Sequence, residues 1–174
     1  MENHNQYQQS IDLMNQALGK EVATSLQYIY FHVYCENMGY KYLATMWRNT
    51  SIAEMRHIEE LSERILFLKG DVELNPAFLT KQIHNTKEML QMAVKLEQST
   101  IDEYNASSKI CDEVRDAGSQ HLFRELLEEE EKHIDAFQIE LQNVVDYGME
   151  YLALQAIARS REKNEAKVGD WIQP

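Results

Sequence analysis

Two short segments of the sequence repeat the same arrangement of a glutamate and a histidine. Glu54 is followed three residues later by His57, and Glu130 is followed three residues later by His133. Residues three apart lie on one face of an α-helix, so each pair would present a carboxylate and an imidazole together. Each pair is preceded at the same interval of 33 residues (21 to 54 and 97 to 130) by a further glutamate: Glu21 and Glu97. The duplication predicts one glutamate helix and one Glu-x-x-His helix, each used twice.

Residues that interrupt helices are scarce, since the 174-residue chain contains 2 prolines and 6 glycines. Apolar residues recur at alternating steps of three and four, the pattern of an amphipathic helix. This pattern predicts four long helices and a shorter fifth, over approximately these ranges: 6–38, 41–69, 83–115, 119–147 and 149–163.

The connection expected over residues 70–82 decides how the helices are arranged. Fully extended, it reaches roughly 43–47 Å, about the length of the second helix. It can therefore travel the length of the helices and set the third parallel to the second. The sequence predicts an all-α fold, a four-helix bundle with a long crossover between the second and third helices. We expect a single domain over residues 1–174, with the bundle at about 6–147, a short fifth helix at about 149–163 and a tail at 164–174.

The four glutamates all lie within the apolar stripes and near the middle of their helices. Helices aligned at their ends would bring the four carboxylates to one level of the core. Buried charges without partners cost several kcal/mol each, and the stripes contain no lysine or arginine to compensate them. Divalent cations would compensate, and carboxylate oxygens with one imidazole per ion suit iron or manganese, although zinc would also bind. A single Glu-x-x-His on a helix is common by chance, but two with matched glutamates predict a dinuclear metal site.

Composition excludes several other kinds of partner. The formal net charge of −12 argues against binding to nucleic acid or to an anionic membrane. No stretch approaches the ~20 apolar residues that span a bilayer, and the polar start of the chain has no secretory signal pattern, so we expect a cytoplasmic location. Helical geometry would place Cys35 and Cys111 about 42 Å apart, too far for a disulfide, and both are expected to be buried thiols.

Taken together, these features resemble the ferritin-like di-metal carboxylate superfamily and, within it, the bacterioferritins. The resemblance covers essentially the whole chain and is strongest at residues 54–57, 63–70 and 129–135. It implies that Glu21, Glu54 and His57 ligate one iron ion, with Glu54 shared between the two ions. It implies that the second ion is held by three further residues, of which Glu130 is also shared: Glu97, Glu130 and His133. Tyr28 matches a tyrosine beside the di-iron centre of the family, and an ordinary core tyrosine with a satisfied hydroxyl is the alternative.

The resemblance also concerns Met55, between Glu54 and His57 in sequence. In bacterioferritins a methionine at this place is an axial ligand of a haem b shared by two subunits. The helical position of Met55, directed away from the glutamate stripe, fits that role, while simple packing at a subunit interface is the alternative. Asn49 and Ala53 stand where some members carry a histidine and an aspartate for an additional inner-surface iron site, so the sequence leaves open whether this chain has such a site.

The function implied is iron storage with ferroxidase activity, in which Fe(II) is oxidised by dioxygen or hydrogen peroxide and stored as ferric mineral. A hollow shell of 24 subunits and a ferredoxin-type electron donor for iron release are the further partners that the resemblance implies. One alternative is a rubrerythrin-like di-iron peroxidase, although the chain has no Cys-x-x-Cys motif for the iron domain that such proteins usually add. The other is a non-catalytic haem-binding shell protein.

Overall fold

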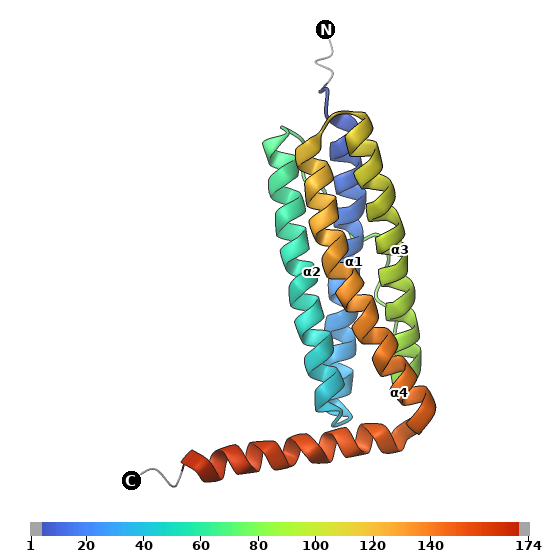
Figure 1. Cartoon of the computed structure of the whole chain (residues 1–174), viewed down its shortest axis with the longest axis vertical. Coiled ribbons are helices and arrows are strands. Elements are labelled where there is room, and N and C mark those ends of the chain that lie inside the picture. Colours follow the sequence, from blue (N-terminus) through green and yellow to red (C-terminus); the bar gives the residue numbers. More distant parts are fainter. Residues whose placement is uncertain (1–4, 171–174) are drawn as a thin grey trace.

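Four long helices stand side by side in the computed structural model (Figure 1). The structure describes residues 5–170 and their side chains, except the side chains of Met149 and residues 159–170. The helices are α1 (Gln8–Asn37), α2 (Lys41–Phe67), α3 (Thr86–Glu113) and α4 (Ala117–Asp170). α1 packs mainly against α2, and α3 packs mainly against α4. The predicted all-α bundle is confirmed, with helix ends that differ from the expected ones by a few residues.

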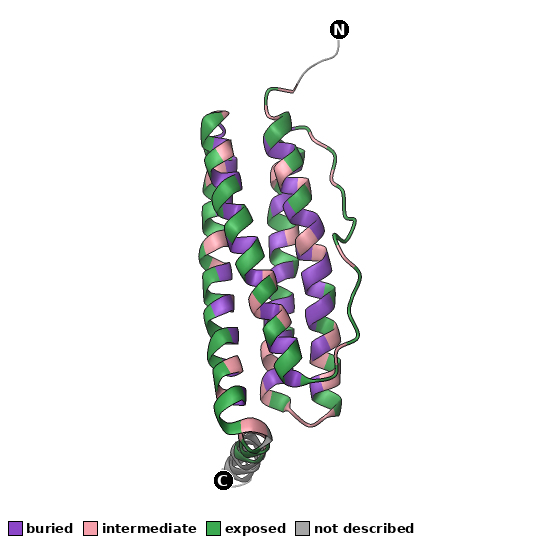
Figure 2. Ribbon diagram, turned by 90° about the vertical axis from the view of Figure 1, so that its right-hand side faces the viewer, coloured by how far each residue is buried: buried purple, intermediate pink, exposed green. Residues whose placement is uncertain are grey.

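The crossover between α2 and α3 occupies residues 68–85 and runs along the outside of the bundle (Figure 2). It is hydrogen-bonded to three residues of α1: Asn15, Gly19 and Gln27. The Gln27 side chain makes two of these bonds with Lys81, accepting from its backbone nitrogen at 2.7 Å and donating to its carbonyl at 3.0 Å. The crossover therefore travels the length of the bundle, and α2 and α3 are parallel as expected.

The third helix begins at Thr86, three residues later than the sequence pattern indicated. The side chain of Asn85 accepts a hydrogen bond from the backbone nitrogen of Glu88 at 3.1 Å. This bond satisfies one of the free N–H groups at the start of the helix, as an N-cap residue does. Asn85 therefore fixes where α3 begins.

α4 bends sharply at Gly148, whose backbone has φ 60° and ψ −147°. Residues with a Cβ atom rarely adopt this conformation, so glycine suits the bend. The helix beyond it runs across the end of the bundle and reaches Asp170, further than the expected end near residue 163 (Figure 1). Part of the expected tail at 164–174 is therefore helical, and residues 171–174 lie outside the described part of the chain.

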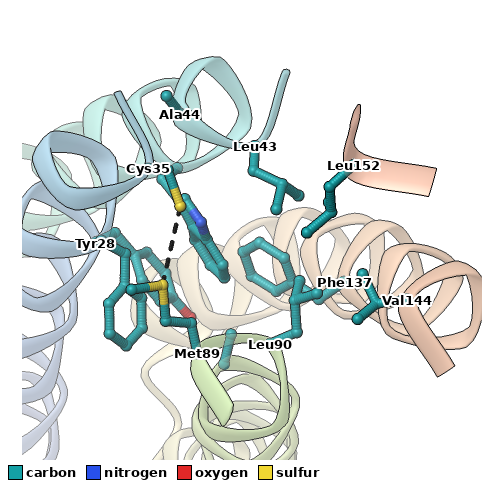
Figure 3. Packing of buried hydrophobic residues seen from close by; sticks show 12 residues of the cluster. Tyr28, Cys35, Leu43, Ala44, Met89, Leu90, Phe137, Val144 and Leu152 are labelled. Carbon is teal, nitrogen blue, oxygen red and sulfur yellow. Dashed lines mark hydrogen bonds between the residues drawn. The ribbon is translucent and has the colours of Figure 1, made fainter. Parts of the chain in front are cut away.

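The apolar core consists of two clusters, one toward each end of the bundle. The first contains Tyr28 and Phe137 and is joined by Leu152, which folds back from the segment after the bend (Figure 3). The second contains Tyr104 and Phe123, whose ring centroids are 5.4 Å apart. In every helix the glutamate singled out above lies in sequence between the two clusters. The bundle therefore has an acidic layer between two apolar layers.

Both cysteines are buried free thiols, as expected. In Figure 3 the Cys35 sulfur contacts the Met89 sulfur at 3.8 Å. Within residues 5–170, no helix combines the length and the apolar character needed to cross a membrane.

Candidate metal centre

The acidic layer places one buried carboxylate from each helix at the same level. The side chains come from α1 to α4 in turn, and each is 2% exposed or less: Glu21, Glu54, Glu97 and Glu130. Ligand atoms gather in two sets, each lying within 4.8 Å of one another. Glu21 and His57 belong to the first set, Glu97 and His133 belong to the second, and Glu54 and Glu130 belong to both.

The two shared carboxylates each face both histidines. The Nδ1 atom of His57 lies 3.0 Å from Glu54 Oε2 and 3.0 Å from Glu130 Oε1. The Nδ1 atom of His133 lies 3.3 Å from Glu54 Oε1 and 3.2 Å from Glu130 Oε2. Each carboxylate therefore directs one oxygen to each half of the site, the arrangement needed to bridge two ions.

The electrostatics of the cluster divide its carboxylates into two kinds. Burial, followed by repulsion from Glu54 and Glu130, raises the pKa of Glu21 well above its ordinary value. Burial and the same two neighbours likewise raise the pKa of Glu97. Burial opposes ionisation of Glu130 as well, but the neighbouring imidazoles of His133 and His57 lower its pKa. Without a cation, the cluster therefore favours protons on the outer pair of carboxylates.

The histidines respond in the opposite sense. Burial lowers the pKa of His133, but the neighbouring carboxylates of Glu130 and Glu54 outweigh burial and raise the pKa to about 10. Burial likewise opposes protonation of His57, and the neighbouring carboxylates of Glu130, Glu21 and Glu54 raise its pKa above the ordinary value. In the absence of metal, protons on the histidines thus neutralise the carboxylate charges that bound cations would otherwise neutralise.

Unpaired atoms test whether this donor set fits metal ions. Among the described residues, four buried polar atoms of the cluster have no hydrogen-bond partner: Glu54 Oε1, Glu54 Oε2, His57 Nδ1 and Glu130 Oε1. Buried polar atoms are nearly always paired, and unpaired ones call for an explanation such as a bound ion. All four belong to residues of the two sets of ligand atoms. Oxygen-rich donors with one imidazole per ion fit iron or manganese.

Two buried tyrosines complete the surroundings of the outer carboxylates. Tyr28 of α1 donates a hydrogen bond to Glu97, and Tyr104 of α3 donates one to Glu21. Tyr28 also packs against Trp47, with ring centroids 5.3 Å apart. Tyr104 lines a cavity of about 490 Å³ between α1, α3 and the crossover. Each tyrosine therefore joins an apolar cluster to a carboxylate of the acidic layer.

Comparison with known proteins agrees with this geometry. Residues 11–146 match the ferritin-like domain family. The bacterioferritin of Brucella melitensis is 35% identical over 140 residues, which cover 80% of this chain and 87% of the relative. The chain belongs to the bacterioferritin family.

Other bacterioferritins agree in length as well as in sequence. The bacterioferritin of Mycolicibacterium paratuberculosis is 29% identical over 147 residues, which cover 84% of this chain and 92% of that relative. The X-ray structure of the Desulfovibrio desulfuricans bacterioferritin superposes with a TM-score of 0.85 at 26% identity, over 89% of this chain and 91% of that one. That structure was determined to describe a di-iron site in different catalytic states.

Met55, the further site residue expected of a bacterioferritin, lies outside the cluster. Its side chain is 47% exposed, and Ile52, one helical turn away, is 42% exposed. α1 and α2 meet where Ser51 Oγ donates to the Ser25 carbonyl, so the exposed Leu26 of α1 belongs to the same region of the surface. Met55 is thus one of several exposed apolar residues of α1 and α2.

Tyr104 was not among the site residues expected from the sequence. A usable signal was present, since Tyr104 follows Glu97 by seven residues as Tyr28 follows Glu21. The repeat that relates the two Glu-x-x-His pairs therefore includes the tyrosines. Glu129 was also missed as a contact of the site: its Oε2 atom lies 3.2 Å from His57 Nε2.

Proposed function

We propose that this chain is an iron-storage ferroxidase that oxidises Fe(II) at the six-residue centre and stores the ferric product within a shell of identical subunits. The supporting observation is the pair of carboxylates, Glu54 and Glu130, that each direct one oxygen to His57 and one to His133. Two adjacent ions held in this way would lose one electron each to a common oxidant. The family membership supports the same activity.

Each protein group has a definite part in this proposal. Glu21 and His57 would bind one Fe(II), Glu97 and His133 would bind the other, and the shared carboxylates would hold both. The two ions together supply the two electrons that reduce dioxygen to hydrogen peroxide or hydrogen peroxide to water. The tyrosines at Glu97 and Glu21 orient these carboxylates, and the apolar clusters above and below exclude water. Tyr28 donates a hydrogen bond to the ligand Glu97. We assign to Tyr28 any transfer of an electron from the protein to the site.

Iron oxidation provides the test. Apoprotein loaded anaerobically with two Fe(II) per subunit should oxidise both rapidly when air is admitted, and further additions should build a ferric core. His133→Ala should slow the fast phase by about tenfold or more, as expected for loss of a ligand. His121→Ala is the matched control, because His121 is exposed and pairs only with Glu125 among the described residues. Turnover with peroxide alone and no mineral would instead identify a rubrerythrin-like peroxidase.

We further propose that Met55 binds haem b together with Met55 of a second copy. The thioether of methionine can ligate haem iron. A haem held in this way would supply electron-transfer chemistry. In support, Met55 is one of five apolar residues that α1 and α2 leave exposed: Leu26, Ile29, Val33, Ile52 and Met55.

The remaining parts of the proposal follow the family. They are a 24-subunit shell, a cytoplasmic location and a ferredoxin-type donor of electrons for iron release. The mass of the native particle and the oxidation of a reduced ferredoxin by the loaded shell are the corresponding measurements. A monomer or dimer that stores no mineral would exclude the shell.

A further inference from the structure

The two histidines of the centre have unequal surroundings. His57 is 1% exposed, and the nitrogen that faces away from the cluster, Nε2, lies 3.2 Å from Glu129 Oε2. The His133 side chain is 15% exposed, and the described residues offer its Nε2 atom no hydrogen-bond partner. The imidazole of His57 therefore has a carboxylate at the nitrogen that faces away from the cluster, and the imidazole of His133 has none there.

The internal repeat explains where this difference arises. The two halves of the centre are related by an offset of 76 residues, which takes each of four positions to its counterpart: 21 to 97, 28 to 104, 54 to 130 and 57 to 133. By the same offset, the counterpart of Glu129 is Ala53. A methyl group cannot accept a hydrogen bond, so the repeat is interrupted at the position that would otherwise support His133. The His133 side chain is 15% exposed, so only water can take the place of the missing acceptor at its Nε2 atom.

A carboxylate behind a metal-binding histidine has a known physical effect. It accepts the proton of the distal nitrogen, which fixes the tautomer and turns the lone pair of the other nitrogen toward the metal. The contact from Glu129 therefore leaves Nδ1 of His57 directed at Glu54 and Glu130, at 3.0 Å from each. Arg56 approaches the same Glu129 oxygen at 3.5 Å and supports its position.

We propose that Glu129 is a positioning residue for His57 and that it makes the two metal positions unequal. The half containing His57 binds the first ion tightly, and the half containing His133, which has alanine at the matching position, binds the second ion more weakly. The inference rests on the proposed di-metal function and adds to it the order in which the two metal positions bind their ions. Glu129 would act through His57 and would not itself contact the metal.

The test is stepwise titration of the metal-free shell with Co(II), followed by its visible absorption and by calorimetry. Wild-type protein should bind two Co(II) per subunit in two resolved steps. His133→Ala should keep the tight step and lose the weak one, whereas His57→Ala should keep only a weak step. Glu129→Ala should weaken the first step by about 10–100-fold, the range seen when such supporting groups are removed. Glu129→Gln, which retains an acceptor oxygen, should recover part of that loss.

Glu131→Ala is the matched control, because Glu131 is an exposed glutamate on the same turn of α4. It should leave both steps unchanged. The metal-free Glu129→Ala and Glu131→Ala proteins should unfold at the same temperature. A weaker first step in Glu129→Ala would then reflect the position of His57 and not a less stable fold. An unaltered first step in Glu129→Ala, or a tight step that survives in His57→Ala and not in His133→Ala, would overturn the inference. Failure of wild-type protein to bind two ions would instead count against the proposed function.

Discussion

The hydroxyl of Tyr104 donates a hydrogen bond to the carboxylate of Glu21, which joins α3 to α1 inside the acidic layer. Both side chains are buried, at 1% and 2% exposed. A carboxylate held by a fixed donor can adopt few rotamers, so its free oxygen stays directed at the centre of the cluster. Tyr104 therefore restrains one of the proposed metal ligands.

Replacement of Tyr104 by phenylalanine tests this restraint. The ring and its packing on Phe123 would remain, and the donor to Glu21 would be lost. We expect about tenfold slower oxidation of the first two Fe(II) per subunit, at the lower end of the range for groups that orient ligands. Stopped-flow absorbance measures the rate, and Tyr147→Phe, at a tyrosine that is 65% exposed, is the control. Equal rates of Fe(II) oxidation in the Tyr104→Phe and Tyr147→Phe proteins would show that Tyr104 has no part in the reaction.

Substitution of Met55 by leucine should abolish haem binding and leave the helices intact. Leucine keeps the volume and apolar character of the exposed surface but has no sulfur to bind iron. The Soret band of the purified protein and its reconstitution with haem measure the effect. Met92→Leu, on α3, should retain the band. Haem retained by the Met55→Leu protein would mean that another residue supplies the axial ligand.

Metal binding to the apoprotein should release protons at neutral pH. The pKa of His133 is raised to about 10, so this group holds a proton at pH 7 and must lose it to bind a cation, and the raised pKa values of Glu21 and Glu97 favour proton release from them as well. Apparent affinity should therefore increase as pH increases from about 6 to 8. A weakly buffered titration with Zn(II) and a pH indicator measures the release. Binding without release would show that the apoprotein cluster is already deprotonated.

The turn between α3 and α4 provides a prediction about stability. Burial would raise the pKa of Asp116, but hydrogen bonds from Ser119 and the contact with Arg64 outweigh it and lower the pKa. A lowered pKa stabilises the folded state above the unfolded pKa, and that contribution is lost as pH falls through the folded value. Asp116→Asn should reduce the free energy of unfolding by about 1–3 kcal/mol at pH 7.

Urea denaturation at several pH values measures this contribution. The difference between wild type and Asp116→Asn should become smaller as pH falls below ~4, where the carboxyl of the unfolded chain binds a proton while the folded one is still ionised. Asp112→Asn, at an exposed aspartate near the end of α3, should change little at either pH. A constant difference across the range would assign the effect to packing and not to charge.

The acidic layer was predictable because two physical regularities coincide in the sequence. The period of the apolar stripes placed Glu54 and Glu130 in the core, and similar helix lengths placed them at one level. The crossover could be predicted from its reach alone. The start of α3 was missed because the apolar pattern continues to Ile83, whereas the capping bond of Asn85 decides the boundary.

Contacts between helices were harder to foresee. The bond from Tyr104 to Glu21 and the contact from Glu129 to His57 depend on how the helices are rotated relative to one another. The apolar pattern of a single helix does not give this rotation. Glu129 also looks like an ordinary surface glutamate in a run of four, residues 128–131. The length of the helix after Gly148 was underestimated because the apolar pattern weakens toward the end of the chain.

Neither half of this chain can surround an ion by itself. α1 and α2 form one antiparallel hairpin and α3 and α4 form another, yet each set of ligand atoms takes members from both. A loaded ion therefore fastens one hairpin to the other across the middle of the subunit. If a protease cut the crossover, the bound metal ions would still hold the two hairpins of the subunit together. A shell without metal at these centres would be mechanically softer than one with the centres filled.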